Sequence, residues 1–281
     1  MSSAAAPPEF SVRFWGVRGS IATADAQTLR YGGNTSSLEV RCGDRRILLD
    51  AGTGIRYAGL ALQREGKPID ADLLLTHTHL DHIVGLPFFG PFFVPGNRFR
   101  VYAGHLLPDL NIRQVLTDLM RAPFFPVPPE AFRAEIEFKD FRAGETLRLS
   151  PEIAIRTVAL NHPNGATGYR IEFAGKSICY LTDTEHVVDQ PNQAILDLIA
   201  GADIMIYDAT YTDAEFPSHL HWGHSTWQEG ARLATAAGVG IYVVFHHDPD
   251  HDDVMLDGIA AELRQMRPGS LMAREGLILK P

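Results

Sequence analysis

Cysteine is scarce in this sequence. Cys42 and Cys179 are the only two among 281 residues, and they fall in separate predicted strands. Two cysteines so placed do not make the disulfide framework that stabilises small secreted domains. This usage suits a reducing compartment, so we expect a cytoplasmic protein.

Long apolar runs are also missing. No uninterrupted apolar stretch approaches the roughly 20 residues that a membrane-spanning helix requires, so no membrane partner is expected. Residues 1–9 (MSSAAAPPE) lack the basic start and apolar segment of a signal peptide, and we interpret them as a flexible N-terminal tail. We find no internal repeat, and we expect residues 10–281 to form a single domain.

Positive charge is in deficit. The chain has 25 Lys and Arg against 34 Asp and Glu, a formal net charge of −9, and no dense basic run. Such a protein has no general electrostatic affinity for nucleic acid or anionic membranes, so extended nucleic acid is a disfavoured partner. Apolar residues make up 45% of the chain, which is ample for a substantial core.

Histidine, in contrast, is concentrated in one short stretch. Leu73, Leu74 and Leu75 predict a buried strand, and residues 76–82 (THTHLDH) follow it directly. Imidazole and carboxylate groups are the natural ligands of zinc and similar divalent ions. His77 and His79 would project the same way if strand geometry persists. Residues 81 and 82 then turn away, which suggests a second ion beside the first.

The same residue types follow other predicted strands. Five strand ends carry an Asp or a His, at Asp50, in residues 77–82, and at His162, Asp183 and His246-His247. Loops at strand ends can aim side chains at a common point on a rigid scaffold. A shared metal site gives these five endings one explanation.

The pattern His-x-His-x-Asp-His after an apolar strand resembles the signature of the metallo-β-lactamase superfamily, and the resemblance extends over residues 10–281. It implies an α/β fold, the αββα sandwich of two mixed β-sheets flanked by helices. It also implies two divalent ions, with zinc expected and manganese or iron as alternatives.

The resemblance also implies a ligand for each position. The first ion would be held by His77, His79 and His162, and the second by Asp81, His82 and His246, with His247 as the alternative to His246. Asp183 would bridge both ions, and Asp50 would orient the histidines without binding metal. True metallo-β-lactamases commonly have Cys at the bridging position, whereas Asp suits hydrolases of phosphodiesters, thioesters and related substrates.

Two further motifs narrow the resemblance. Asp208-Ala209-Thr210 resembles the acidic-Ala-Thr motif of ribonuclease Z, although that enzyme has Glu, and residues 224–226 resemble its His-Ser-Thr motif. In that branch Asp208 would orient His224, and His224 would donate a proton to the leaving oxygen. A hydroxide held by the two ions would attack phosphorus, with Asp81 helping to orient it.

We therefore expect a metal-dependent hydrolase, a phosphodiesterase for a small phosphodiester such as a cyclic nucleotide or cyclic phosphate. Hydrolysis of a lactone or thioester by the same two-metal hydroxide is the alternative. A second alternative is a ribonuclease Z-like tRNA 3′-processing endonuclease. It is disfavoured because that enzyme normally binds tRNA with a long basic arm, and this sequence has no dense basic run. A non-catalytic metal-dependent ligand-binding protein is the alternative from a different class.

Two local predictions remain. Residues 86–135, rich in Pro and Phe, are expected to form an apolar elaboration beside the site, serving as a substrate wall or a homodimer contact, with core packing as the alternative. Ser225 with Gln228 has capping-box spacing, which predicts that a helix opens at Ser225.

Overall fold

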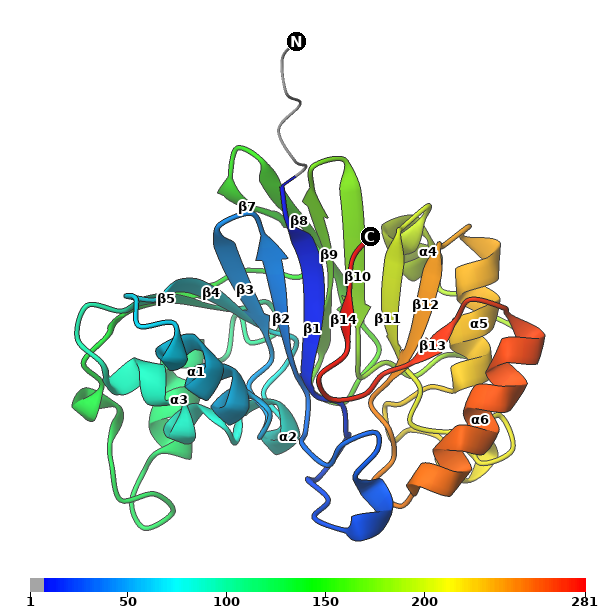
Figure 1. Ribbon diagram of the computed structural model, residues 1–281, viewed down its shortest axis with the longest axis horizontal. Helices are drawn as coiled ribbons and strands as arrows, with labels where there is room; N and C mark the ends of the chain where they lie inside the picture. The colour runs from blue at the N-terminus through cyan, green and yellow to red at the C-terminus, as the bar shows by residue number, and fades with distance from the viewer. Residues whose placement is uncertain (1–7) are drawn as a thin grey trace.

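The computed structural model describes residues 8–281, so residues 1–7 of the predicted tail lie outside the described part. Two seven-stranded sheets pack face to face with helices outside them (Figure 1). In spatial order the first sheet comprises β14 (Ile278–Leu279), β1 (Phe10–Gly16), β2 (Ser37–Cys42), β3 (Arg45–Leu49), β4 (Asp70–Leu75), β5 (Arg98–Ala103) and β6 (Glu135–Asp140). The second comprises β13 (Leu271–Met272), β12 (Ile241–Phe245), β11 (Ile204–Asp208), β10 (Lys176–Leu181), β9 (Ala166–Phe173), β8 (Ile153–Leu160) and β7 (Thr146–Ser150).

Both sheets mix parallel and antiparallel pairs. In the first sheet β3, β4, β5 and β6 run parallel, while β1 and β2 pair antiparallel. In the second sheet β10 to β13 run parallel, while β7 to β10 form antiparallel pairs. The outer layers contain α1 (Ile55–Arg64), α3 (Ile112–Leu119), α4 (Gln193–Ile199), α5 (Trp227–Ala236) and α6 (Asp253–Met266), while the short α2 (Leu80–Ile83) lies at the lower edge of the sandwich in Figure 1. The predicted αββα sandwich is confirmed.

The three leucines of β4 explain why this strand has consecutive apolar residues and no alternation of polar and apolar ones. Leu74 belongs to the buried cluster between the two sheets, which also includes Tyr180 and Phe245. Leu73 and Leu75 point to the opposite face and pack beneath the outer helices. Successive side chains of a strand alternate between faces, and both faces of this sheet are covered, so all three positions are buried.

The predicted site residues gather at one end of the sandwich, the lower edge in Figure 1. The parallel strands β3, β4, β10, β11 and β12 all finish at this edge, and antiparallel β8 contributes the loop that carries His162. Carboxyl ends of neighbouring parallel strands meet at one edge, where loops can hold functional groups on a rigid base. Among the described residues, none of the helices is both long and apolar enough to cross a membrane.

Two elements differ from the sequence predictions. The helix expected to open at Ser225 begins at Trp227, and its N-cap is Thr226, whose side chain accepts a hydrogen bond from the Glu229 backbone N–H. Ser225 instead places its hydroxyl 2.8 Å from His186 Nδ1. The predicted elaboration at residues 86–135 also contains β5, a strand paired with β4 and β6 that we did not predict.

The phenylalanines of this segment divide between core and surface. Phe89 and Phe92 are buried and pack edge-on against Phe99 of β5, under the outer helices. Phe88 and Phe124 are exposed. Core packing therefore accounts for Phe89 and Phe92, and their rings are not free to form a substrate wall.

Candidate metal centre

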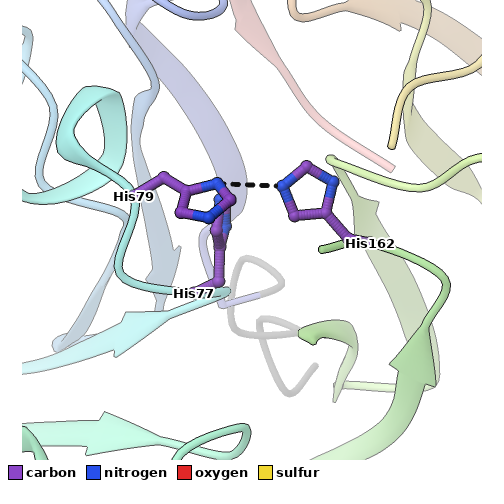
Figure 2. A group of neighbouring side chains, drawn as sticks. All are labelled: His77, His79 and His162. Carbon is purple, nitrogen blue, oxygen red and sulfur yellow. Dashed lines mark hydrogen bonds between the residues drawn. The ribbon is translucent and has the colours of Figure 1, made fainter. Parts of the chain in front are cut away.

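The first group of candidate ligands consists of His77, His79 and His162. Figure 2 shows His77 and His79 projecting from the loop after β4 toward His162, which comes from the loop after β8 of the other sheet. His162 Nε2 lies 3.0 Å from His79 Nδ1. One nitrogen from each ring falls within 4.8 Å of the others, close enough to share one ion.

The second group consists of Asp81, His82, Asp183 and His246, and all four side chains are buried. His82 Nε2 lies 3.2 Å from Asp81 Oδ2 and 3.3 Å from His246 Nε2. His246 Nε2 lies 3.3 Å from the same Asp81 oxygen. Two imidazoles and two carboxylates thus present their ring nitrogens and oxygens to a common point.

Asp183 lies between the two groups and turns one oxygen toward each. Its Oδ1 is 3.1 Å from His82 Nε2 and 3.2 Å from His246 Nε2. Its Oδ2 is 3.7 Å from both His77 Nε2 and His162 Nε2. This is the arrangement expected of a carboxylate that bridges two cations.

An unpartnered nitrogen of His77 is a second observation that fits a divalent cation at this site. His77 Nε2 is fully buried and has no hydrogen-bond partner. Burial lowers the pKa of His77 well below its usual value, so this ring is neutral and one of its nitrogens has a free lone pair. A buried polar atom without a partner is costly unless something else satisfies it, and a metal ion does so.

Asp50 supports the histidines from behind. It accepts hydrogen bonds from the Thr76 backbone N–H at 2.7 Å and from the Tyr180 hydroxyl at 2.8 Å, and its Oδ2 lies 2.9 Å from His82 Nδ1. Contact through Nδ1 fixes the orientation of the ring and leaves Nε2 directed at the second group. Asp50 therefore contacts His82 from the side away from the second group, and it belongs to neither group of candidate ligands.

His246 and His247 face in different directions. His246 belongs to the second group, and its Nδ1 lies 3.0 Å from the Thr210 hydroxyl. His247 Nε2 lies 2.8 Å from the backbone oxygen of Ala273, on the far side of the strand end. The geometry thus brings His246, and not His247, into the cluster.

His224 and Asp208 lie against the same cluster. His224 Nδ1 is 3.0 Å from Asp208 Oδ2 and 3.9 Å from Asp183 Oδ2. Although burial opposes the charged form, the Asp208 carboxylate and its hydrogen bond raise the pKa of His224 to about 9. Asp208 also accepts hydrogen bonds from the Thr210 backbone N–H and hydroxyl, so its position is fixed.

Several supporting groups were not predicted as site residues. The Ser20 backbone N–H donates to Asp81 Oδ2 at 2.8 Å, and the Gly223 carbonyl lies 2.8 Å from His162 Nδ1. Tyr180 and Thr210 contact Asp50 and His246, as described above. The Asp-Ala-Thr motif could have indicated Thr210, whereas Tyr180 lies 130 residues from Asp50 and only the fold brings them together.

The backbone is strained at three of these strand ends. Asp50, Asp183 and His246 have φ values of 58°, 59° and 64°, in the left-handed region that residues with a side chain rarely adopt. Such conformations cost about 1–3 kcal/mol each and persist where the surroundings hold them, typically at functional sites. Close packing accompanies them: a Cβ atom on Gly19 would lie 2.4 Å from His246 Nδ1.

The two-sheet sandwich and the paired His and Asp groups at its edge define a protein of the metallo-β-lactamase class. The family described as Beta-lactamase superfamily domain matches residues 45–247, and the chain belongs to this family.

Known proteins resemble the chain over nearly its whole length. A ribonuclease Z of Bradyrhizobium diazoefficiens is 25% identical and covers 95% of this chain and 98% of its own. The metallo-β-lactamase fold protein YhfI from Bacillus subtilis is 20% identical, with a TM-score of 0.70 over 97% of this chain and 99% of its own. A diphosphatase of the PhnP family is 22% identical, with a TM-score of 0.71 over 97% of each chain. The family and the ribonuclease Z relative together indicate a hydrolase.

Proposed function

We propose that this protein is a two-metal hydrolase of a small phosphodiester, such as a cyclic nucleotide or cyclic phosphate. The observation that carries the proposal is the position of Asp183, with Oδ1 turned to one group of imidazoles and Oδ2 to the other. The first group would hold one ion, the second would hold another, and Asp183 would bridge them. Zinc suits this His and Asp set, and manganese or iron is also compatible with it.

A pair of divalent ions, when bound, lowers the pKa of water and neutralises the charge that develops on a phosphoryl group. Around that centre the chain supplies orientation. Asp81 is held by the Ser20 N–H, so its carboxylate can position the attacking water from a fixed point. Asp50 and the Gly223 carbonyl hold His82 and His162 through their Nδ1 atoms, so these rings cannot rotate away.

His224 is the proposed proton donor to the leaving oxygen. Its Nδ1 is engaged by Asp208, which leaves Nε2 free to face a substrate. The ring lies beside Asp183 and next to the His162 ring, with 5.4 Å between their centroids, and ligand atoms of these three residues lie within 4.8 Å of one another. We assign His224 the acid role because Asp208 engages its Nδ1. A positioned imidazole of this kind contributes about 10²–10⁴-fold to a proton-transfer step.

A phosphodiester substrate is favoured by the family relationship and by the acid pair. The ribonuclease Z relative, which matches over nearly its whole length, is named for action on RNA. The Asp208–His224 pair resembles the acidic-Ala-Thr and His-Ser-Thr motifs of that branch, with Asp in place of its Glu, and an Asp at the bridging position suits phosphodiester hydrolysis. The net charge of −9 favours a small substrate over tRNA.

The test is a substrate panel with the metal-loaded protein. Metal per chain is counted, and bis-p-nitrophenyl phosphate is assayed beside a lactone, a thioester and a cephalosporin. Hydrolysis of the phosphodiester, with about two ions per chain, is the expected result. Turnover confined to the lactone or thioester would overturn the proposed substrate class and favour the carbonyl alternative.

A further inference from the structure

Four segments that border the candidate metal centre contain neither Lys nor Arg. They are residues 76–97, 161–169, 182–231 and 246–263. The same segments carry acidic residues, among them Glu185, Asp189, Asp248 and Asp250. An enzyme for polyanionic substrates normally surrounds its site with Lys or Arg, because each neutralises one phosphate charge.

Residues 17–36, the loop that contributes Ser20 to the site, contain two arginines, and neither fills this role. Arg18 is fully buried, and its guanidinium donates to the backbone oxygens of Gly32, Asp248 and His251. Arg30 forms ion pairs with Asp253 and Asp257 of α6. Neither guanidinium is available to a phosphate at the centre.

Apolar side chains are exposed beside the centre instead. Ile21 is 65% exposed and follows Ser20, whose N–H binds Asp81. Leu80 is 65% exposed and stands between His79 and Asp81 in the sequence. Trp222 is 61% exposed and precedes Gly223, whose carbonyl contacts His162. We call these three side chains the apolar rim.

Trp222 is held in place by an aromatic series that leads back to the acid pair. Its ring meets the His219 ring edge-on at 5.0 Å, and His219 stacks on Tyr211 at 4.2 Å. The Tyr211 ring lies 6.1 Å from the His224 ring. Gly223 is also fixed, because its N–H donates to Glu185 and a Cβ there would lie 2.3 Å from His162 Nδ1. An exposed indole held this firmly offers a flat stacking surface at low entropic cost.

We propose, resting on the function proposed above, that the substrate is a phosphodiester with a single negative charge and a planar aromatic or apolar group, and that Trp222 of the apolar rim receives this group. The metal centre then binds the only anionic group, and the acidic loops select against further phosphates. Stacking of a base on an aromatic side chain is worth enough to change specificity by about 5- to 100-fold.

The test compares two esters with the same leaving group and the same charge, phenyl p-nitrophenyl phosphate and methyl p-nitrophenyl phosphate. The metal-loaded wild-type protein should show a kcat/KM for the phenyl ester about 5- to 100-fold higher. In Trp222→Ala the ratio of kcat/KM for the phenyl ester to that for the methyl ester should fall toward one. In Trp222→Phe most of the wild-type preference should be restored. Tyr57→Ala, which removes a 46% exposed ring from α1, is the matched control and should keep the wild-type ratio.

The charge limit is tested with the p-nitrophenyl ester of thymidine 5′-phosphate, with and without an added 3′-phosphate. The added phosphate should lower kcat/KM. Binding is followed independently of turnover through indole fluorescence, since Trp15 is half-buried and Trp227 is buried while Trp222 is exposed. The monophenyl ester of methylphosphonic acid, a non-hydrolysed probe, should quench the wild-type signal and leave that of Trp222→Phe unchanged.

Three results would overturn the inference while the proposed function stands. The first is equal kcat/KM for the two esters in the wild type, and the second is faster hydrolysis with the added 3′-phosphate. The third is retention of the full preference in a folded, metal-loaded Trp222→Ala. Absence of hydrolysis of every phosphodiester would instead overturn the proposed function, and the inference would fail with it.

Discussion

The carboxylate of Asp208 holds the ring of His224 through Nδ1, with 3.0 Å between the two atoms, and ligand atoms of His224 lie within 4.8 Å of those of His162 and Asp183 on one side and of His246 on the other. Asp208 is fully buried and comes from the end of β11, whereas His224 lies just before α5. In the proposed function this pair donates the proton, while the two groups of ligands bind metal. Substitutions can therefore distinguish the two roles.

Replacing His224 with Ala should lower kcat by about 10²–10⁴-fold for a phosphodiester with a poor leaving group, while metal content stays unchanged. The loss should be smaller for a p-nitrophenyl ester, because p-nitrophenolate leaves without a proton. His221→Ala is the matched control, since that ring is 93% exposed and outside the cluster. Loss of metal in His224→Ala would contradict the acid role.

Asp50→Asn should weaken both the metal site and the fold. An amide has one oxygen where the carboxylate has two, so either the Tyr180 hydroxyl or the Thr76 N–H loses its acceptor, at a cost of about 1–3 kcal/mol. Metal affinity should fall about 10- to 100-fold as His82 loses its support. Chemical denaturation and metal titration measure the two effects, with exposed Asp44→Asn as the control. Unchanged metal affinity would show that Asp50 has no orienting role.

His246→Ala should lose one of two ions, whereas His247→Gln should keep both, because only the His246 ring faces the second group. Metal analysis of the two purified variants shows which of the two histidines is the terminal ligand. If His247→Gln lost an ion and His246→Ala did not, the placement of the terminal ligand would be wrong.

The stability of the metal-free protein should fall as the pH drops from about 6.5 toward 4. Burial, with the neighbouring His79 and His162, lowers the pKa of His105 to about 4. The unfolded chain therefore takes up a proton in this range that the folded chain does not, and stability present above pH 6.5 is lost, at up to about 1.4 kcal/mol per pH unit. Chemical denaturation of the wild type and His105→Gln at several pH values measures this, and the variant should show a shallower slope. Parallel slopes would contradict it.

Much of this architecture follows from local sequence signals. The leucines of β4 and the polar residues after five strands could be predicted because apolar runs and strand ends are local features of the sequence. Strand β5 is harder to predict from the sequence. Residues Arg98-Phe99-Arg100-Val101 alternate between polar and apolar, but the Pro-rich segments on both sides obscure the pattern. The side chain of Arg100 is tied to Asp72 of the neighbouring strand, a contact that needs the assembled sheet.

The parts that could not be predicted depend on long-range contacts. Ser225 and Thr226 are both plausible N-caps, with Gln228 and Glu229 three residues later, and His186 decides between them by engaging the Ser225 hydroxyl. The end of β12 differs from this case. The resemblance favoured His246 over His247 from its strand-end position, and only the left-handed backbone at His246, which turns that ring into the cluster, needed the structure.

The most direct test of the central claim is a metal count and phosphodiesterase assay on the wild type and Asp183→Ala, with Asp189→Ala as an exposed control. We predict about two ions per chain and phosphodiester hydrolysis in the wild type and the control, and joint loss of bound metal and activity in Asp183→Ala. An Asp183→Ala protein that kept both ions and its turnover, or a wild type that took up one ion at most, would contradict the bridged two-metal centre.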